Sequence, residues 1–508
     1  MSLTSPAQHE IDDRRYTMHD LGRLVAERPR LSLSADVAEA IDRGSAFLIK
    51  KLDQDLHIYG VNTGLGALCE IRLTDDEVNQ LQRKLLMSHA CGVGEIVPED
   101  LSRLTLLIKL LTFRSGHTAI AECTVRRLID FWNADVIPTL PKRGTVGASG
   151  DLAPLAHLAL PLIGLGQVWS GGRPQDAGPV LAAHGWEPLQ LRPKEGLALV
   201  NGVQYINAMA VRSLLEIDQL VRYADLVAAL SVQAFSVSRS FCHARYHQTS
   251  LHPERAIVAA NLRKLLEGSN HYSLTTANKS QQDPYSFRCI PQVHAAVRQA
   301  LAFATTVIEQ EVNSVSDNPL FFPDEDQILY GGNLHGASTA MVLDLLAIAT
   351  TELGSISERR AYQLLSGSRG LPDFLVENAG VNSGFMVTQY TAAALVNENK
   401  VLSTPASVDT IPTCQLQEDS VSMGGTSGYK LAQVIENCRQ ILAIELLLAM
   451  QAIDLNRELM PSDRAKAMHT HFRQHVAFLA EDRLMSSDIE RSTEFLVNHG
   501  PRYIDDIR

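Results

Sequence analysis

The sequence lacks the features by which several large classes of protein are usually recognised. It has no Lys/Arg-rich run, and its formal net charge is −12, so a partner with a phosphate backbone is not expected. Its seven cysteines are scattered and form no C-x-x-C pair, which favours a reducing compartment over a disulfide framework. The first 15 residues are polar and do not read as a secretory signal. We therefore expect a cytoplasmic protein that binds neither nucleic acid nor a membrane.

Long uninterrupted apolar runs are also missing. The most apolar stretch, residues 152–169, is broken by Pro154, Pro161 and several glycines, so it predicts a buried segment rather than a membrane span. The chain is long, and its composition is that of an ordinary globular protein. Its 508 residues are 45% hydrophobic and 20% charged, which is enough for a large core in one domain or in several.

Several common catalytic motifs are absent too. Ser149 is not the nucleophile of a G-x-S-x-G elbow, because Asp151 stands where the last glycine is required. The phosphate loop G-x-x-x-x-G-K-[ST] does not occur. His243 and His247 have i, i+4 spacing, but the residue after the first histidine is not glutamate, and adding Cys242 does not complete a set of four ligands. We expect no metal site.

The apolar periodicity predicts a mainly α-helical fold. Residues 431–449 repeat apolar side chains at spacings of three and four, which gives one wide apolar face. Residues 205–235 are helix-like with scarcely a breaker, and the stretches 293–315 and 337–365 are similar in length. They predict a bundle of long helices, in which ligand sites are built between facing helices.

The first 200 residues predict shorter elements. Helical spacing covers residues 36–52 and 81–90, and residues 101–132 predict two helices around the turn Ser115-Gly116. We divide the chain into a mixed, mostly helical N-terminal domain (1–200) and a domain with the long-helix bundle and the C-terminal helices (201–508). The loops of both parts carry unusual polar residues, and loops on a rigid scaffold are where binding and catalysis are usually found.

One loop suggests an unusual chemistry. Ala148-Ser149-Gly150 offers three small residues before an acid, and small residues allow the tight turn that would bring the amide nitrogen of Gly150 onto the carbonyl carbon of Ala148. Closure with loss of water, and dehydration of Ser149, would give a methylidene-imidazolone electrophile. The triplet alone is equally compatible with an ordinary turn.

Five motifs, in this order, resemble the aromatic amino-acid ammonia-lyases, which form that electrophile from Ala-Ser-Gly. They are Tyr-Gly-Val-Asn-Thr-Gly at 59–64, Gly-Ala-Ser-Gly-Asp-Leu-Ala-Pro-Leu at 147–155, Lys-Glu-Gly-Leu-Ala-Leu-Val-Asn-Gly at 194–202, Asp-Pro-Tyr-Ser-Phe-Arg at 283–288 and Gln-Glu-Asp-Ser-Val-Ser-Met at 417–423. The resemblance covers nearly the whole chain, from about Tyr59 to the helices beyond Met450. It implies a carbon–nitrogen lyase that needs no external cofactor, and a homotetramer with sites shared between subunits.

The resemblance also implies roles for single residues. It makes Tyr59 the base that removes the β proton, although a tyrosine with a reference pKa near 10 needs a cationic or hydrogen-bonding neighbourhood to do so. It makes Arg288 the clamp of the substrate carboxylate, a role that suits the guanidinium fork. The other implied residues of the pocket are amides that hold the amine, the carboxylate or the imidazolone oxygen, and residues that line the site: Asn201, Asn333, Gln282 and Tyr285.

Two positions bear on the substrate. Ser88-His89 matches the pair of histidine-specific members, and a histidine can hydrogen-bond an imidazole nitrogen. Glu418 stands where related phenylalanine enzymes carry an amide, and a carboxylate favours a ring that can donate a proton. Three residues depart from the family pattern: Val203 replaces threonine, Leu334 replaces phenylalanine, and Ser420 replaces the histidine of histidine-specific members.

We therefore predict elimination of ammonia from L-histidine to give trans-urocanate. Three alternatives stay open at this point. The chain could be a tyrosine or phenylalanine ammonia-lyase, or a 2,3-aminomutase of the same family, since tyrosine aminomutases also resemble Ser-His at residues 88–89. It could also be an inactive helical scaffold or binding protein that kept the fold.

Overall fold

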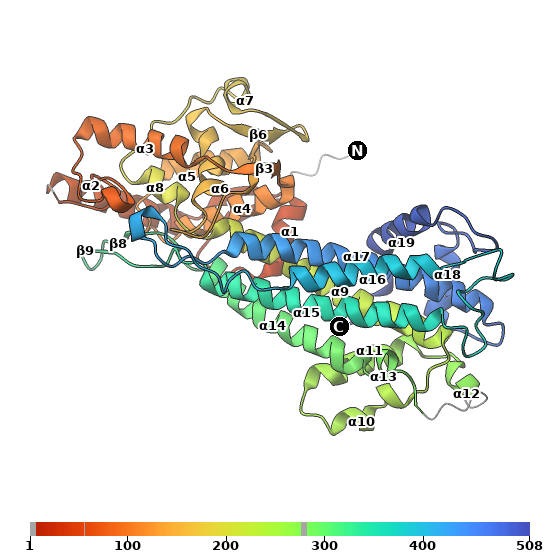
Figure 1. The fold of residues 1–508 in the computed structure, drawn as a ribbon. Helices are drawn as coiled ribbons and strands as arrows, with labels where there is room; N and C mark the ends of the chain where they lie inside the picture. The colour runs from red at the N-terminus through yellow and green to blue at the C-terminus, as the bar shows by residue number, and fades with distance from the viewer. Residues whose placement is uncertain (1–6, 55, 276–281) are drawn as a thin grey trace. The chain divides into compact units, whose positions relative to one another are not determined.

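The computed structural model describes residues 7–54, 56–275 and 282–508. It is mainly helical with short strands, as the periodicity predicted (Figure 1). Two compact units are formed by segments that alternate along the chain. Unit 1 comprises the described residues of Met1–Leu215 with Thr305–Leu343 and Pro405–Tyr429; unit 2 comprises those of Glu216–Ala304, Asp344–Thr404 and Lys430–Arg508. The boundary predicted at residue 200 separates an earlier from a later part of the chain, whereas each unit combines three segments from different parts of the chain.

The first 200 residues form eight shorter helices and seven strands among the described residues. The helices are α1 (Met18–Glu27), α2 (Ala35–Asp53), α3 (Asp75–His89), α4 (Glu99–Phe113), α5 (Glu122–Asn133), α6 (Leu152–Ala159), α7 (Ala177–Ala183) and α8 (Glu195–Val200). The strands are β1 (Gln8–Ile11), β2 (Arg30–Leu33), β3 (Val93–Ile96), β4 (Ile137–Pro138), β5 (Pro141–Arg143), β6 (Gln167–Ser170) and β7 (Arg173–Asp176). Their pairings are β1 with β2 in parallel, β3 with β5, and the antiparallel sheet β4-β6-β7.

The helices of this part begin where capping residues allow. Thr17 starts α1 in a capping box with Asp20, Ser34 caps α2, and Thr74 starts α3 in a capping box with Glu77. Each such side chain satisfies backbone N–H groups that the first turn leaves without a partner. The helices predicted at residues 36–52, 81–90 and 101–132 are confirmed as α2, α3 and the pair α4 and α5.

The rest of the chain contains the long helices. They are α9 (Gln204–Ala234), α14 (Ile290–Val312), α15 (Ala337–Leu364), α16 (Met386–Leu402) and α17 (Gly424–Leu455). Shorter helices are α10 (Ala244–Gln248), α11 (Pro253–Leu265), α12 (His271–Thr275), α13 (Tyr285–Arg288), α18 (Asp463–Phe472) and α19 (Met485–His499), and the hairpin β8 (Leu320–Phe322) and β9 (Gln327–Leu329) belongs to unit 1. The four long helices predicted from the sequence are confirmed as α9, α14, α15 and α17.

Unit 2 holds a buried polar network between its helices. The Glu445 carboxylate accepts hydrogen bonds from the Arg360 guanidinium at 2.6 and 2.8 Å and from the hydroxyls of Ser231 and Ser357, each at 2.6 Å. A buried carboxylate is tolerated when its oxygens are satisfied in this way. The network fixes how α9, α15 and α17 face one another within this unit.

Among the described residues one helix, α15, is long and apolar enough to cross a membrane by length and composition. However, 61% of its most apolar window is buried inside the protein. Most of this window therefore packs against the rest of the protein. Residues 152–169 are also largely buried, as predicted, and form α6, a 3-10 turn (Leu160–Ile163) and most of β6.

Candidate active site

Three helices of unit 1 bring their ends to one place. Helices α3, α6 and α8 pack against one another. His89 is the last residue of α3, Asp151 is the N-cap of α6, and Asn201 is the C-cap of α8. Gly196 permits the close approach, because a Cβ there would lie 2.9 Å from the backbone oxygen of Gln82 in α3. The short helices of the N-terminal part therefore act as the scaffold of the site.

Ala148-Ser149-Gly150 forms a tight left-handed turn between β5 and α6. Ser149 has φ 53° and Gly150 has φ 82°, and only glycine adopts such values at no cost. The turn is held against residue 202, since the Asp151 amide donates to the Gly202 carbonyl at 2.7 Å and the Gly202 amide donates to the Ser149 carbonyl at 3.3 Å. A Cβ on Gly150 would lie 2.1 Å from the Gly202 oxygen. The fold therefore requires glycine at the third position of the triplet.

Glu418 contacts the triplet directly. The Ser149 hydroxyl donates to Glu418 Oε1 at 2.6 Å, and the Thr413 hydroxyl donates to Oε2 at 2.9 Å. Backbone pairing of Thr413 with Glu418 closes a short loop whose residues Cys414, Gln415 and Leu416 all have positive φ. Strain of this kind is maintained only where the surroundings over-determine it. The loop therefore holds the carboxylate against the serine.

Tyr59 reaches the same place from the loop between α2 and α3. Its hydroxyl accepts a hydrogen bond from the Gly66 amide at 3.0 Å, and the Ala67 amide donates to Cys414 Sγ at 3.3 Å. The pKa of Tyr59 is raised, chiefly by burial; the Gly66 amide opposes the shift and the charge of Glu418 adds to it. To act as a base, Tyr59 needs cationic or hydrogen-bonding neighbours. Among the described residues only a backbone N–H donor is present beside its hydroxyl.

Two adjoining cavities meet at these side chains. One, of about 520 Å³, is lined by Tyr59, His89, Ser149, Asn201 and Glu418 together with apolar residues of α3 and α8. The other, of about 640 Å³, shares Tyr59, Ser149 and Glu418. Most of the residues predicted for the site in unit 1 are thus brought together around spaces of the size that small-molecule sites occupy.

His89 presents a defined edge to the first cavity. The Ser88 hydroxyl lies 3.2 Å from the Leu85 carbonyl, to which it donates, and 3.0 Å from His89 Nδ1. Since the single hydroxyl proton goes to the carbonyl, Nδ1 carries the imidazole proton and Nε2 remains an acceptor. This tautomer is assigned from the hydrogen-bond network. Burial lowers the pKa of His89, which keeps the ring neutral near pH 7.

Asn201 offers an unpaired acceptor in the same cavity. Its Oδ1 is buried and has no hydrogen-bond partner among the described residues, which is uncommon for a native polar atom and calls for a ligand or water. Its backbone carbonyl accepts from Lys109 Nζ at 2.7 Å. The backbone of Asn201 is thus held by Lys109, whereas its side-chain Oδ1 can still accept a hydrogen bond in the cavity.

Buried ionisable groups support the site, and most of them were not predicted from the sequence. Burial raises the pKa of Asp151 to about 7 and lowers that of Lys109 to about 7. Asp151 is held by the Ile206 amide at 2.9 Å and by the Thr145 hydroxyl at 3.1 Å. Shifts of this size concentrate at functional sites. Lys109 could have been found from the sequence. It lies in the mostly apolar run 104–113, where a lysine is expected to be buried, and a buried charge needs a partner.

Of the neighbouring residues Asn333 and Leu334, Leu334 lines one of the two cavities and Asn333 does not. Leu334 and Ser420, two of the departures from the family pattern, line the second cavity. Asn333 instead donates to the Val315 carbonyl at 3.3 Å and does not belong to the lining of either cavity. Val203, the third departure, is fully buried.

The remaining predicted residues belong to unit 2 and form a cluster of their own. The Arg288 guanidinium donates to Gln282 Oε1 and lies over the Tyr285 ring, 4.4 Å from its centroid. Tyr285 is 71% exposed. Asp283 anchors this segment by an ion pair with Arg369 at 2.7 Å. A tyrosine and an arginine are therefore presented together on α13.

Comparison with known proteins defines the class. The pattern described as aromatic amino acid lyase matches residues 16–474. The chain therefore belongs to the aromatic amino acid lyase family and is a carbon–nitrogen lyase by class, as the five motifs predicted.

Particular relatives narrow this further. The chain is similar to the histidine ammonia-lyase of Symbiobacterium thermophilum, with 42% identity over 95% of both chains. Among solved structures it is similar to histidine ammonia-lyase from Trypanosoma cruzi, with a TM-score of 0.90 and 36% identity over 98% of this chain and 95% of that one. It is also similar to tyrosine aminomutase from Streptomyces globisporus, with a TM-score of 0.91 and 35% identity over 99% of both chains.

Proposed function

We propose that this lyase eliminates ammonia from L-histidine to give trans-urocanate. The observation that carries the proposal is the set of side chains around one cavity: Tyr59, His89, Ser149, Asn201 and Glu418. Such a set combines an acceptor and a carboxylate for an imidazole ring with a hydroxyl-bearing turn and a phenol. The similarity to histidine ammonia-lyases supports the same substrate.

The triplet Ala148-Ser149-Gly150 is proposed to supply the electrophile as a methylidene-imidazolone. Its geometry fits, because the left-handed φ values of Ser149 and Gly150 give the tight turn that ring closure needs, and Glu418 accepts a hydrogen bond from the Ser149 hydroxyl at 2.6 Å. Once formed, the ring supplies an electrophile that captures the substrate amine and makes it a better leaving group.

The residues around the cavity can orient the substrate. His89 Nε2 would accept from the imidazole N–H, and Glu418 would hold the other edge of that ring or its cationic form. The unpaired Oδ1 of Asn201 would accept from the α-ammonium group, which removes the cost of leaving that oxygen buried without a partner. These contacts would fix the β carbon near the Tyr59 hydroxyl, the proposed base.

The carboxylate clamp is proposed to come from a second copy of the chain. Tyr285 is exposed and Arg288 lies against it, so α13 presents a guanidinium fork suited to a carboxylate. In this arrangement the functional form is a homotetramer with shared sites, in which Gln282 positions Arg288. The free thiols of all seven cysteines support a cytoplasmic location.

A product assay tests the proposal. The purified protein is incubated separately with L-histidine, L-phenylalanine and L-tyrosine, and the ultraviolet spectra of the products are compared. Urocanate from histidine at the highest kcat/KM is expected. The intact mass should be lower than the sequence mass by two water molecules, and Ser149→Ala should abolish both this loss and the activity. No urocanate, with cinnamate or coumarate instead, would refute the choice of substrate.

An aminomutase is the second candidate. It is favoured by the similarity to tyrosine aminomutase and by the family resemblance at Ser88-His89, where tyrosine aminomutases also resemble Ser-His. The same assay separates the two, because a mutase returns a β-amino acid and releases little ammonia. Chromatography of the amino-acid fraction, with an enzymatic ammonia measurement, identifies the outcome.

A further inference from the structure

Three histidines far from the proposed active-site residues in the sequence come together in unit 2. His471 lies in the last turn of α18, His475 in the loop after it, and His499 at the last position of α19. Their ring centroids are separated by 4.7, 4.8 and 5.2 Å. One nitrogen from each lies within 4.8 Å of the other two, and among the described residues this is the one such group of three found.

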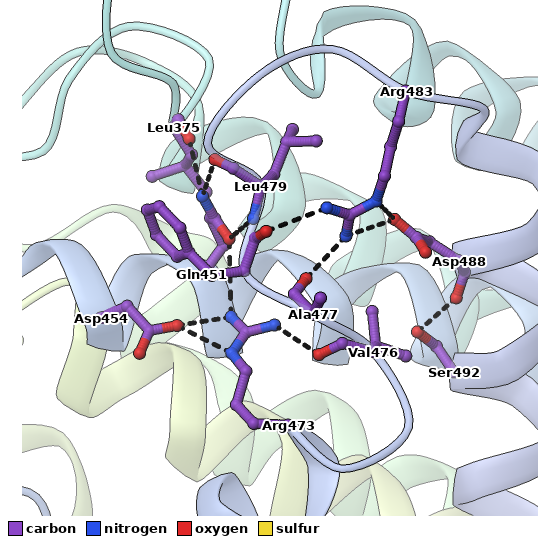
Figure 2. Close-up of polar contacts among 11 residues, drawn as sticks. Leu375, Gln451, Asp454, Arg473, Val476, Ala477, Leu479, Arg483, Asp488 and Ser492 are labelled. Atoms are coloured by element: carbon purple, nitrogen blue, oxygen red, sulfur yellow. Dashed lines mark hydrogen bonds and ion pairs between the residues drawn. The ribbon is translucent and has the colours of Figure 1, made fainter.

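The loop that carries His475 is held on both sides by side chains (Figure 2). Before it, Arg473 donates to Asp454 at 2.9 and 2.5 Å and to the Val476 carbonyl at 3.0 Å. After it, Arg483 donates to the Ala477 carbonyl at 2.6 Å and to Asp488 at 2.9 Å. A ligand on so restrained a backbone loses little entropy when it binds, which favours a preorganised site.

The end of the loop is fixed as well. The Gln451 amide donates to the Leu479 carbonyl at 2.9 Å and accepts from the Leu479 amide at 3.1 Å (Figure 2). Below the histidines, the buried ring of Phe495 packs against all three imidazoles at 5.0 to 5.5 Å. The three imidazoles therefore pack on one apolar ring, and the loop that carries His475 is restrained by hydrogen bonds.

The partners of the rings favour a metal over a purely structural cluster. The Tyr503 hydroxyl lies 3.2 Å from His471 Nδ1; in the tautomer in which Nδ1–H donates to the Tyr503 oxygen, as a metal-bound histidine donates to its outer-shell partner, Nε2 has a free lone pair. Three imidazoles this close repel one another when protonated. Neutral imidazoles do not repel one another in this way and each has one lone pair that can bind a metal, and imidazole suits zinc, copper and nickel.

Arg502 opposes binding in the structure as it stands. Its Nη2 lies 3.1 Å from His499 Nδ1, so Nδ1 accepts and the proton of that neutral ring sits on Nε2. His499 can become a ligand only if Arg502 withdraws. Because Arg502 is exposed, this movement is inexpensive. Substitution of Arg502 therefore distinguishes a metal site from a purely structural cluster, because only a metal site should bind the ion more tightly without Arg502.

We propose that His471, His475 and His499 bind one divalent transition-metal ion of the zinc class. Zinc–nitrogen bonds of about 2.0–2.1 Å set tetrahedral ligand atoms about 3.4 Å apart, so nitrogens now up to 4.8 Å apart must close by at most about 1.4 Å. Rotation of the imidazoles supplies this, and water fills the fourth position. The site is distinct from the proposed lyase chemistry and does not depend on it, and it departs from our expectation of no metal at the sequence level.

The test measures zinc bound per chain by equilibrium dialysis of the full-length protein against limiting Zn²⁺. His475→Ala is compared with His184→Ala, an exposed histidine of unit 1 that stacks on Trp186. The wild type and the control should hold one ion more than H475A, and His499→Ala should lose the same ion. Affinity should fall at least about tenfold on loss of a ligand, since loss of an outer-shell partner alone costs about 10- to 100-fold.

Arg502→Gln supplies the second arm. The proposal expects R502Q to tighten zinc binding, because it removes a positive charge and frees His499. Equal zinc in the wild type, H475A and H499A would overturn the proposal, since any bound ion would then sit on other groups such as the free cysteines. Unchanged or weaker binding in R502Q would overturn the assigned geometry. Histidine turnover should be the same in all four variants.

Discussion

Substitution of Gly150 by alanine gives the sharpest test of the turn that bears the proposed electrophile. Gly150 has φ 82°, and a Cβ there would lie 2.1 Å from the Gly202 oxygen and 2.4 Å from the Gly202 carbonyl carbon. These are backbone atoms, so no side-chain rotation relieves the clash. The turn must move away from residue 202.

The size of the effect follows from two contributions. A left-handed conformation costs a residue with a Cβ about 1–2 kcal/mol, and moving the turn leaves the Gly202 carbonyl without the Asp151 amide, now 2.7 Å away. Loss of that partner at a buried position adds about 1–3 kcal/mol. G150A should therefore destabilise unit 1 by roughly 2–5 kcal/mol in total. It should also misplace the Gly150 nitrogen for ring closure.

Gly94 offers a matched control. It has φ 92°, and a Cβ there meets nothing within 4 Å, so Gly94→Ala suffers the conformational cost alone. Intact mass reports ring formation, and the midpoint of thermal unfolding reports stability. G94A should lose two waters like the wild type and show a small shift, whereas G150A should keep the full mass and shift further. A G150A chain that forms the ring in full yield would refute the reasoning, as would equal shifts for the two variants.

Three further predictions concern the cavity and its surroundings. His89→Phe removes the Nε2 acceptor and should lower kcat/KM for histidine by roughly 5- to 150-fold, as expected when a buried N–H loses its partner at about 1–3 kcal/mol; steady-state kinetics with phenylalanine should show no matching loss, and equal losses for both substrates would contradict the assignment. Glu418→Gln keeps the shape but removes the charge next to Ser149, and should lower the histidine-to-phenylalanine preference by about tenfold or more; an unchanged ratio would argue against Glu418 as a selector. Burial raises the pKa of Asp151 from 3.8 to about 7, so the folded state keeps a proton that the unfolded state has released, and the contribution of Asp151 to stability should fall as pH rises from about 4 to about 7 and stay constant above that. Asp151→Asn should flatten this slope in thermal midpoints measured across that range, and a variant with the wild-type slope would contradict it.

The sequence predicted the long helices and the class of chemistry well, for a physical reason. Apolar residues at spacings of three and four over about 20 positions, and long stretches with scarcely a breaker, allow little besides a buried helix, and α9, α14, α15 and α17 lie close to the predicted stretches. The motif around Ser149 was readable because a tight turn demands small residues. Both signals are local, so a single stretch of chain contains them.

What the sequence could not predict depends on distant contacts. Lys109 and Asp151 lie 42 positions apart, and their shifted pKa values arise from burial that no local pattern encodes. Asn333 is implied for the pocket by the family resemblance, yet its amide donates to the Val315 carbonyl, because the packing of its loop decides where the side chain goes. His471, His475 and His499 meet because a hydrogen-bonded loop returns α19 to α18. The sequence did show the i, i+4 spacing of His243 and His247. His243 instead caps α10, and the His247 ring hydrogen-bonds the Phe241 carbonyl.

Tyr59 shows what the proposed chemistry still requires. Burial raises its pKa, the Gly66 amide only partly offsets that shift, and the next contributions come from Glu418 and two cysteines, which raise it further. None of these groups is cationic, so the phenol in this environment is a weaker base precursor than a tyrosine in water. Proton abstraction near neutral pH therefore needs a positive charge brought to the cavity. Arg288, which we propose a second copy of the chain contributes, would supply it together with the carboxylate clamp, and this links the working pKa of Tyr59 to assembly.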